Sequence, residues 1–207
     1  GIALHLERLD DSVRTPDEIA EQLNLPVLGL IPAIKVERAG TGAAPALMER
    51  LVTHASPRSP VAEAYRAMRS NLAFTRAREA MKTVVLTSPG PADGKSTTVA
   101  NLAITFAQQG QRTLLIDADL RRAVLDKTFA VPRSPGLTEV IVGEAELEHT
   151  VSGTDVPNLY VLGSGQFPPN PSELLGSAAM REVLRSASEQ FDIVLLDSPP
   201  LLAVTDA

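Results

Sequence analysis

Residues Thr83–Gly110 read TVVLTSPGPADGKSTTVANLAITFAQQG, and they are the most informative segment of the chain. The run Thr83–Thr87 is apolar or β-branched and predicts a buried strand. A loop rich in Gly and Pro follows it. The segment Ser96–Gln109 then predicts a helix that carries its apolar residues on one face and ends at Gly110. A strand that passes through a Gly-rich loop into a helix is the arrangement that binds the phosphates of a nucleotide.

The loop itself supplies the groups that a polyphosphate needs. We expect the phosphates to contact Gly90, Pro91, Ala92, Asp93, Gly94, Lys95, Ser96 and Thr97. Backbone N–H groups of such a loop converge on the anion, and the N-terminus of the helix adds its positive end. Lys95 would reach the β- and γ-phosphates, and the Ser96 hydroxyl would bind Mg²⁺. Pro89 stands where the strict pattern has Gly, so the prediction depends on the strand and helix around the loop.

Apolar runs continue downstream and alternate with helical segments. The expected strands are Thr113–Asp117, Leu159–Leu162 and Asp192–Asp197, and Ser172–Gln190 is an expected helix. Continuous apolar strands that alternate with helices predict an α/β fold with a doubly wound, mostly parallel sheet and helices on both faces. With the phosphate loop, this pattern indicates a P-loop NTPase.

Three carboxylates follow two of these strands. Asp117 and Asp119 stand at the end of one strand, and Asp197 ends another. Because ligands of open parallel sheets bind at the carboxyl ends of the strands, we expect these side chains to converge with Lys95. Carboxylates beside a polyphosphate require a cation between them, so Mg²⁺ is implied. The alternative is that strand-end Asp residues only form turns, which is common for a single residue.

The first 60 residues differ in pattern from the rest. Thr15–Asp17 predicts the start of a helix that ends near Asn24, and Val27–Ile31 predicts a short strand or an extended arm. Residues 35–60 predict a linker, because Gly and Pro interrupt them repeatedly. A helix is expected at Val61–Ala80. We therefore expect an arm and linker over residues 1–60 and a P-loop domain over residues 61–207.

Composition excludes several classes of protein. The 207 residues carry 19 Lys and Arg against 25 Asp and Glu, a net charge of −6, which argues against a nucleic-acid partner. The absence of Cys excludes a disulfide scaffold, a thiolate metal site and a cysteine nucleophile. No stretch approaches the ~20 apolar residues of a membrane span, and no signal peptide is recognisable. The chain itself is therefore expected to be soluble.

Three motifs resemble those of the bacterial tyrosine kinases, the cytoplasmic kinase domains of polysaccharide co-polymerases. Ser88–Ser96, Ile116–Arg122 and Leu196–Pro200 are similar to the Walker A, Walker A′ and Walker B motifs of that family. Glu63–Arg69 fits its Glu-x-x-Arg-x-x-Arg helix. Pro168–Leu175 resembles a loop that precedes a helix in the same family. The resemblance therefore extends over most of the chain.

The resemblance implies a Mg-ATP-dependent protein tyrosine (auto)kinase that regulates capsular or exopolysaccharide synthesis and export. In such an enzyme Lys95 would bind the transferring phosphate. Ser96 and Asp197, with Asp119, would hold Mg²⁺. One of Asp117 or Asp119 would position or deprotonate the attacking tyrosine hydroxyl, and the resemblance leaves open which of the two does so.

The resemblance also implies partners and a location. Glu63, Arg66 and Arg69 would mediate ring-like self-association, although their spacing alone also fits a solvated helix face. Protein substrates would include the enzyme's own tyrosine-rich C-terminal tail. That tail and the end of the domain are expected beyond Ala207, and Arg14–Pro32 resembles the segment that follows the second transmembrane helix. The expected partner is thus the membrane-embedded portion of the same protein or of another chain, at the cytoplasmic face of the bacterial inner membrane.

Two other functions remain open at this point. A partner-switching ATPase of the partitioning or division-site type would share the fold, but it needs a second lysine near the start of the loop, where this chain has Gly90. A nucleotide-binding adaptor without kinase activity is the other alternative. Tyr65 and Tyr160 fall in a predicted helix and a predicted strand, so we expect them to pack in the fold and not to accept phosphate.

Overall fold

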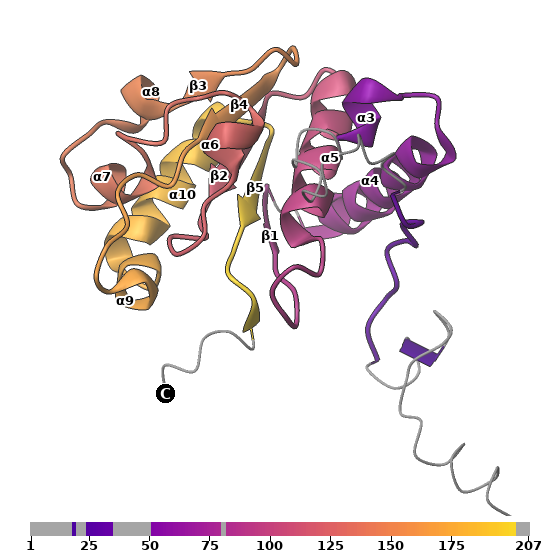
Figure 1. The fold of residues 1–207 in the computed structure, drawn as a ribbon, viewed down its shortest axis with the longest axis horizontal. Coiled ribbons are helices and arrows are strands. Elements are labelled where there is room, and N and C mark those ends of the chain that lie inside the picture. Colours follow the sequence, from indigo (N-terminus) through magenta and orange to yellow (C-terminus); the bar gives the residue numbers. More distant parts are fainter. Residues whose placement is uncertain (1–17, 20–23, 35–50, 80–81, 202–207) are drawn as a thin grey trace, which may run out of the picture.

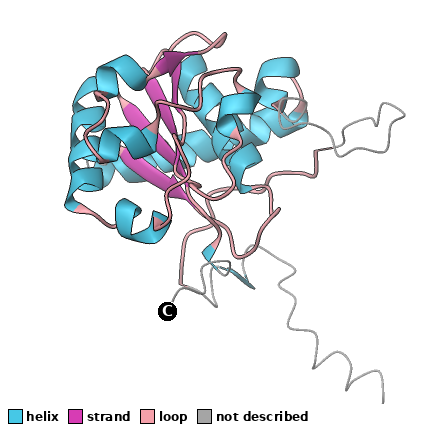
Figure 2. Cartoon of the chain, turned by 60° about the vertical axis from the view of Figure 1, so that its left-hand side comes forward, coloured by secondary structure: helices cyan, strands magenta, loops and turns pink. Residues whose placement is uncertain are grey.

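A five-stranded sheet forms the centre of the molecule, with strand order β1-β5-β2-β4-β3. The computed structural model describes residues 18–19, 24–34, 51–79 and 82–201 (Figures 1 and 2). The strands are β1 (Thr83–Leu86), β2 (Thr113–Asp117), β3 (Ser152–Gly153), β4 (Leu159–Leu162) and β5 (Ile193–Asp197). All neighbours pair in parallel except β3 and β4, which are antiparallel. The prediction of a mostly parallel α/β sheet is confirmed.

Helices cover both faces of this sheet. They are α3 (Val52–Ala55), α4 (Pro60–Glu79), α5 (Lys95–Gln108), α6 (Leu125–Thr128), α7 (Leu137–Ile141), α8 (Leu147–Thr150), α9 (Pro171–Leu175) and α10 (Ala178–Gln190). In Figure 1, α3, α4 and α5 lie on one side of β1 and β5, and α7 and α10 lie on the other. Every residue of β2 and β5 is buried, because these central strands are covered on both faces.

The two faces have separate apolar cores. One core packs residues of α5, such as Leu102 and Phe106, against Leu115 and Leu195 of the sheet. The other packs α7 and α10 against the opposite face of the same strands. Tyr65, on α4, is 1% exposed, and the Tyr160 ring packs edge-on against Phe191. Both tyrosines are therefore packing residues, as predicted.

The expected helix Ser172–Gln190 is wrong in one respect, because the chain forms two helices there. α9 ends at Leu175, and α10 begins after Ser177. The Ser177 hydroxyl accepts a hydrogen bond from the N–H of Met180 at 3.1 Å and so caps α10. Gly176 and the Ser177 cap thus divide into two helices a segment whose apolar residues recur at helical spacing.

The described residues before α4 lie against this body. Glu18 and Ile19 are helical, and the rest of the helix expected before Asn24 lies outside the described residues, as do residues 35–50 of the expected linker. The segment 27–31 forms no strand; it is an extended arm along α4, where the Asn71 side chain donates to the Leu28 carbonyl at 2.9 Å. None of the described helices combines the length and the apolar character that a membrane crossing requires.

Residues 51–59 contact α5 directly. The Thr53 N–H and hydroxyl both donate to the Asn101 side-chain oxygen, at 3.0 and 2.8 Å, and all of these groups are buried. This short segment therefore packs with the P-loop body. The division of the chain at residue 60 stays a prediction.

Candidate nucleotide-binding and catalytic site

The loop between β1 and α5 has the backbone shape that an anion site requires. Gly94, directly before α5, has a φ of 86°, in the left-handed region that favours glycine. Ala92 also has a positive φ, of 67°, which costs a non-glycine residue some strain. Since Gly94 has no side chain to cap the helix, the first N–H groups of α5 are left for a ligand.

Two side chains brace this loop from within. The Asp93 carboxylate accepts a hydrogen bond from the N–H of Gly90 at 2.7 Å, and the Ser88 hydroxyl donates to the Gly90 carbonyl at 2.7 Å. Asp93 is exposed, whereas Ser88 is buried. The predicted loop residues Gly90 and Asp93 therefore contact each other and shape the loop.

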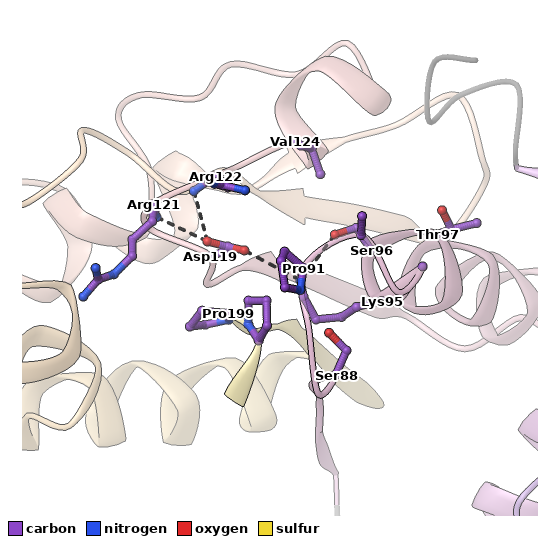
Figure 3. A pocket seen from close by; sticks show the side chains of 13 residues that line it. Ser88, Pro91, Lys95, Ser96, Thr97, Asp119, Arg121, Arg122, Val124 and Pro199 are labelled. Atoms are coloured by element: carbon purple, nitrogen blue, oxygen red, sulfur yellow. Dashed lines mark hydrogen bonds and ion pairs between the residues drawn. The ribbon is translucent and has the colours of Figure 1, made fainter. Parts of the chain in front are cut away.

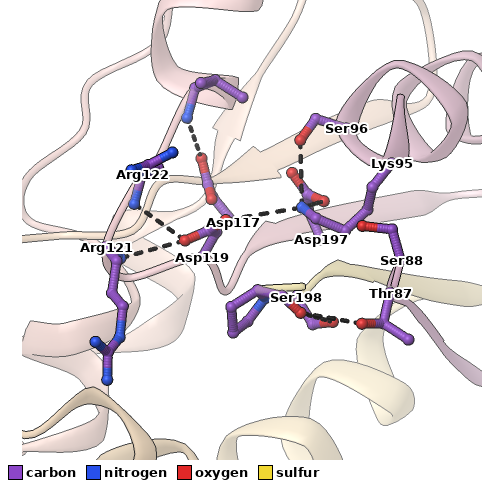
Figure 4. Close-up of polar contacts among 12 residues, drawn as sticks. Thr87, Ser88, Lys95, Ser96, Asp117, Asp119, Arg121, Arg122, Asp197 and Ser198 are labelled. Carbon is purple, nitrogen blue, oxygen red and sulfur yellow. Dashed lines mark hydrogen bonds and ion pairs between the residues drawn. The ribbon is translucent and has the colours of Figure 1, made fainter. Parts of the chain in front are cut away.

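Lys95 joins three elements of the site (Figure 4). Its ammonium group forms a short ion pair with Asp197 at the end of β5. It also lies 3.3 Å from the Ser96 hydroxyl and 3.9 Å from Asp119. The Lys95 side chain is 7% exposed. The structure thus brings together the lysine and two of the three carboxylates that the sequence singled out.

Asp117 is placed differently from the other two carboxylates. One of its oxygens accepts hydrogen bonds from the N–H groups of Val124 and Leu125, at 3.0 and 2.9 Å, at the start of α6. The side chain is fully buried, and this burial, together with the neighbouring Asp197 charge, raises the pKa of Asp117 to about 7. Asp117 therefore orients the segment after β2 and lies behind the pocket surface.

Asp119 lies at the pocket and also forms a turn. One oxygen accepts from the backbone N–H groups of Arg121 and Arg122, at 3.3 and 3.0 Å. The other oxygen is the one near Lys95. The residue therefore forms a turn, as the alternative interpretation predicted, and its other oxygen still faces the pocket lysine; its functional role stays a prediction.

A cavity of about 470 Å³ opens beside the loop (Figure 3). It is lined by Ser88, Pro91, Ala92, Gly94, Lys95, Ser96, Thr97, Asp119, Arg121, Arg122, Val124, Pro199 and Pro200. Six of the eight predicted loop residues are among them, and this size is typical of small-ligand sites. The sequence did not single out Arg122, Val124 or Pro199 as site residues. Arg122 and Pro199 do lie inside the Walker-like motifs, so those motifs could have identified them as site residues.

The donor groups of the site fit a nucleotide with Mg²⁺. Within the described part of the chain, one oxygen of Asp117 and one of Asp197 are buried and have no hydrogen-bond partner. Such carboxylate oxygens, with the Ser96 hydroxyl, are the hard ligands that Mg²⁺ prefers, directly or through water. The described His, Asp and Glu side chains form no complete metal cluster by themselves.

The helix residues expected at an oligomer contact lie outside this pocket. Arg66 pairs with Glu63 on the same helix, with a nitrogen–oxygen distance of 2.7 Å. Arg69 instead donates to the carbonyl of Thr105 on α5 at 2.8 Å. Arg69 therefore binds α5 within the same chain, and the role of the three residues in self-association stays a prediction.

Comparison with known proteins places the chain beside kinases. The family described as AAA domain matches residues 81–207. Tyrosine-protein kinase YwqD of Bacillus subtilis is 43% identical over 161 residues, which is 78% of this chain and 68% of YwqD. Tyrosine-protein kinase ptk of Acinetobacter johnsonii is 35% identical over 99% of this chain, but the match spans only 28% of that longer protein. The kinase domain of Escherichia coli tyrosine kinase ETK superposes with a TM-score of 0.80 at 33% identity, covering 95% of this chain and 77% of that domain.

A division-site protein is structurally less similar. The septum site-determining protein MinD of Pyrococcus horikoshii, solved with Mg-ADP, gives a TM-score of 0.51 at 28% identity and covers 57% of this chain and 49% of MinD. The likeness to ETK extends over much more of the chain. These matches show a P-loop nucleotide-binding fold and favour the kinases over the partner-switching ATPases.

Proposed function

Because this chain belongs to the bacterial tyrosine-protein kinases, ATP-dependent enzymes with a P-loop, we propose that it phosphorylates tyrosine residues of proteins that control capsular or exopolysaccharide synthesis and export. The observation that carries this proposal is the meeting of Lys95, Ser96 and Asp119 at one pocket, with Asp197 paired to the lysine behind it. These groups come from three separate segments of the chain. Their convergence is what phosphoryl transfer requires, because catalysis there is mostly positioning and charge neutralisation.

Lys95 would neutralise charge on the transferring phosphate. Its ammonium group is paired with Asp197. A bound polyphosphate offers a second anionic partner at the mouth of the same pocket. The loop residues 90–97 and the start of α5 would hold the phosphates through backbone N–H groups.

Asp119 is our choice for the carboxylate that acts on the tyrosine hydroxyl. It lines the pocket, whereas Asp117 is fully buried and engaged with α6. We chose between the two carboxylates by their positions and not by their pKa values, because a general base must reach the proton that it accepts. In the step, the hydroxyl oxygen forms a bond to the γ-phosphorus, the bond from that phosphorus to the departing ADP breaks, and the hydroxyl proton passes to the carboxylate. Asp117 would then be a positioning residue.

Magnesium would be held by the Ser96 hydroxyl and by Asp197, with Asp119 beside them. When bound, Mg²⁺ neutralises phosphate charge and supports departure of ADP. The buried unpartnered oxygen of Asp197 supports this assignment, since it leaves an acceptor for a cation or its water.

The wider setting belongs to the same proposal. We infer that the enzyme works at the cytoplasmic face of the bacterial inner membrane, with the membrane-embedded portion of the same protein or of a partner chain. Ring-like self-association through Glu63, Arg66 and Arg69 would bring the tyrosine-rich tail of one subunit to the pocket of its neighbour. The exposed position of Glu63 and its pairing with Arg66 leave that part of α4 open to another subunit.

The test is transfer of phosphate from γ-labelled ATP with Mg²⁺ to tyrosine, measured on the chain extended to its natural C-terminus. We expect labelled phosphotyrosine from the wild type and none from Lys95→Ala. Lys127→Ala is the matched control, because Lys127 is an exposed lysine outside the pocket. It should retain activity.

Other outcomes separate the alternatives. Release of free phosphate without labelled tyrosine would favour the partner-switching ATPase. Nucleotide binding with neither product would favour the adaptor. Label that survives Lys95→Ala would contradict the assigned site.

A further inference from the structure

A second cavity, of about 330 Å³, adjoins the nucleotide pocket. It is lined by Leu120, Arg121, Phe167, Pro168, Pro169 and Pro171. Arg121 lines both cavities, so the two lie next to each other and share that residue. The proline-rich segment Pro168–Leu175 is a motif of the sequence that nucleotide binding leaves without a role.

The walls of this cavity are apolar and aromatic, with positive charge beside them. Phe167 is 50% exposed, although it is large and apolar. The Arg133 guanidinium lies 5.1 Å from the centre of the Phe167 ring. Arg121 is the only charged residue among the described residues that line the cavity. Its side chain extends away from Lys95 (Figures 3 and 4).

A buried carboxylate fixes the segment that carries Phe167. The two oxygens of Glu139 accept hydrogen bonds from the N–H groups of Gly136 and Gln166, at 2.7 and 2.9 Å. Glu139 is 7% exposed. Gln166 directly precedes Phe167, and α9 begins at Pro171. Glu139 therefore anchors the end of the proline-rich wall that carries Phe167.

We propose that this cavity, termed the acceptor cavity, binds an acidic, tyrosine-containing peptide segment of the protein that is phosphorylated. This inference rests on the proposed function and names how its substrate is recognised. Flat proline faces and an exposed Phe ring are suited to stack against a tyrosine ring. Arg121 and Arg133 are suited to bind carboxylates that flank it, because guanidinium groups pair with carboxylates in fixed geometry.

The residue shared with the nucleotide pocket supports this occupant. The N–H of Arg121 donates to Asp119, the carboxylate assigned to the tyrosine hydroxyl. A ring held against Phe167 on one side of Arg121 would therefore lie beside the residues that act on it.

The test measures peptide binding separately from catalysis. The probe is a fluorescein-labelled peptide with one tyrosine between glutamates, titrated into the ADP-loaded protein and followed by anisotropy. A second peptide has alanine in place of the tyrosine. We expect Phe167→Ala to weaken binding of the tyrosine peptide about tenfold, the scale of one lost aromatic contact. It should leave the affinity for a fluorescent ADP analogue unchanged.

The control is Val142→Ala, which removes an exposed apolar side chain elsewhere on the surface. It should bind both peptide and nucleotide as the wild type does. In kinase assays on the same peptide, Phe167→Ala should raise KM about tenfold with little change in kcat.

The outcomes separate this inference from the proposed function. Tyrosine-dependent peptide binding that needs Phe167, in a protein that transfers no phosphate, would support the acceptor cavity and contradict the kinase function. An active kinase whose Kd and KM are unchanged by Phe167→Ala would overturn the acceptor cavity alone. A wild type that binds both peptides equally, or neither, would overturn it as well.

Discussion

The substitution Glu139→Gln tests the buried anchor beneath the acceptor cavity. The two oxygens of Glu139 accept from different backbone N–H groups, those of Gly136 and Gln166, and one also lies 3.3 Å from the Ser134 hydroxyl. A glutamine of the same shape keeps only one oxygen. Its amide NH₂ would therefore face one of the two N–H donors and leave it without an acceptor.

The cost can be worked from these contacts. A hydrogen bond to a charged acceptor contributes about 1.5–3 kcal/mol, and a buried donor left unsatisfied costs about 1–3 kcal/mol. The two effects overlap, so we expect Glu139→Gln to lower the free energy of unfolding by about 3 kcal/mol. For a protein of this size, that corresponds to a fall in Tm of roughly 6–12 °C.

The effect should depend on pH in one direction. Burial favours the neutral form of Glu139, but the hydrogen bonds from Gln166 and Gly136 outweigh it and hold the pKa below the ordinary value of 4.5. A carboxyl whose folded pKa is depressed contributes stability above its unfolded pKa and loses it as the pH falls through the folded pKa. The difference between wild type and Glu139→Gln should therefore be full at pH 7 and shrink below about pH 4.5.

Urea unfolding followed by circular dichroism at pH 7 and at acid pH measures both quantities. Glu144→Gln is the matched control, because Glu144 is exposed and lies in the same part of the chain. It should unfold as the wild type does. A loss below about 1 kcal/mol for Glu139→Gln at pH 7, or a difference that stays constant into acid, would refute this reasoning.

Three further predictions concern Lys95 and the helix α4. Lys95→Met should lower the free energy of unfolding of the protein without nucleotide by about 3 kcal/mol, because it leaves the buried Asp197 unpaired. Adding Asp197→Asn should restore most of that loss in urea unfolding, and strictly additive effects would contradict the pairing. The double substitution Glu63→Ala with Arg66→Ala should shift sedimentation toward smaller species, and unchanged association would contradict the oligomer contact. It should change the free energy of unfolding by less than about 1 kcal/mol, since this ion pair is largely exposed. Arg69→Ala should lower the free energy of unfolding by about 1–2 kcal/mol in dilute protein, because the Thr105 carbonyl loses a charged donor. Loss of association at unchanged stability would contradict a role of Arg69 within its own chain.

Local patterns in the sequence were sufficient for the strands and the phosphate loop. Thr113–Asp117 and Leu159–Leu162 are strands with the expected bounds, and α5 begins one residue before the expected Ser96. These elements are predictable because their signals are local: continuous apolar runs for strands buried on both faces, and Gly-Lys-Ser at a helix start. The convergence of Lys95, Asp119 and Asp197 followed from the same patterns, since parallel strands end at one edge of the sheet.

The tertiary structure was needed to distinguish the positions of Asp117 and Asp119. Asp117 and Asp119 are two residues apart and chemically identical, so the sequence could not separate them. The fold brings the N–H groups of Val124 and Leu125 to Asp117 and leaves an oxygen of Asp119 facing Lys95. The fold also gives Arg69 a partner far away in the sequence. Its spacing on the helix fits a surface residue, but its side chain donates to the Thr105 carbonyl.

The sequence by itself therefore determined the class of fold, the nucleotide loop and the edge of the sheet where the chemistry lies. Only the tertiary structure decided which carboxylate reaches the pocket, how Glu139 anchors the segment before Phe167, and that Arg121 lines a second cavity as well as the first. The physical reason is the range of the interactions. Strand and helix signals arise between residues a few positions apart, whereas burial, buried hydrogen bonds and cavities arise between segments that only folding brings together.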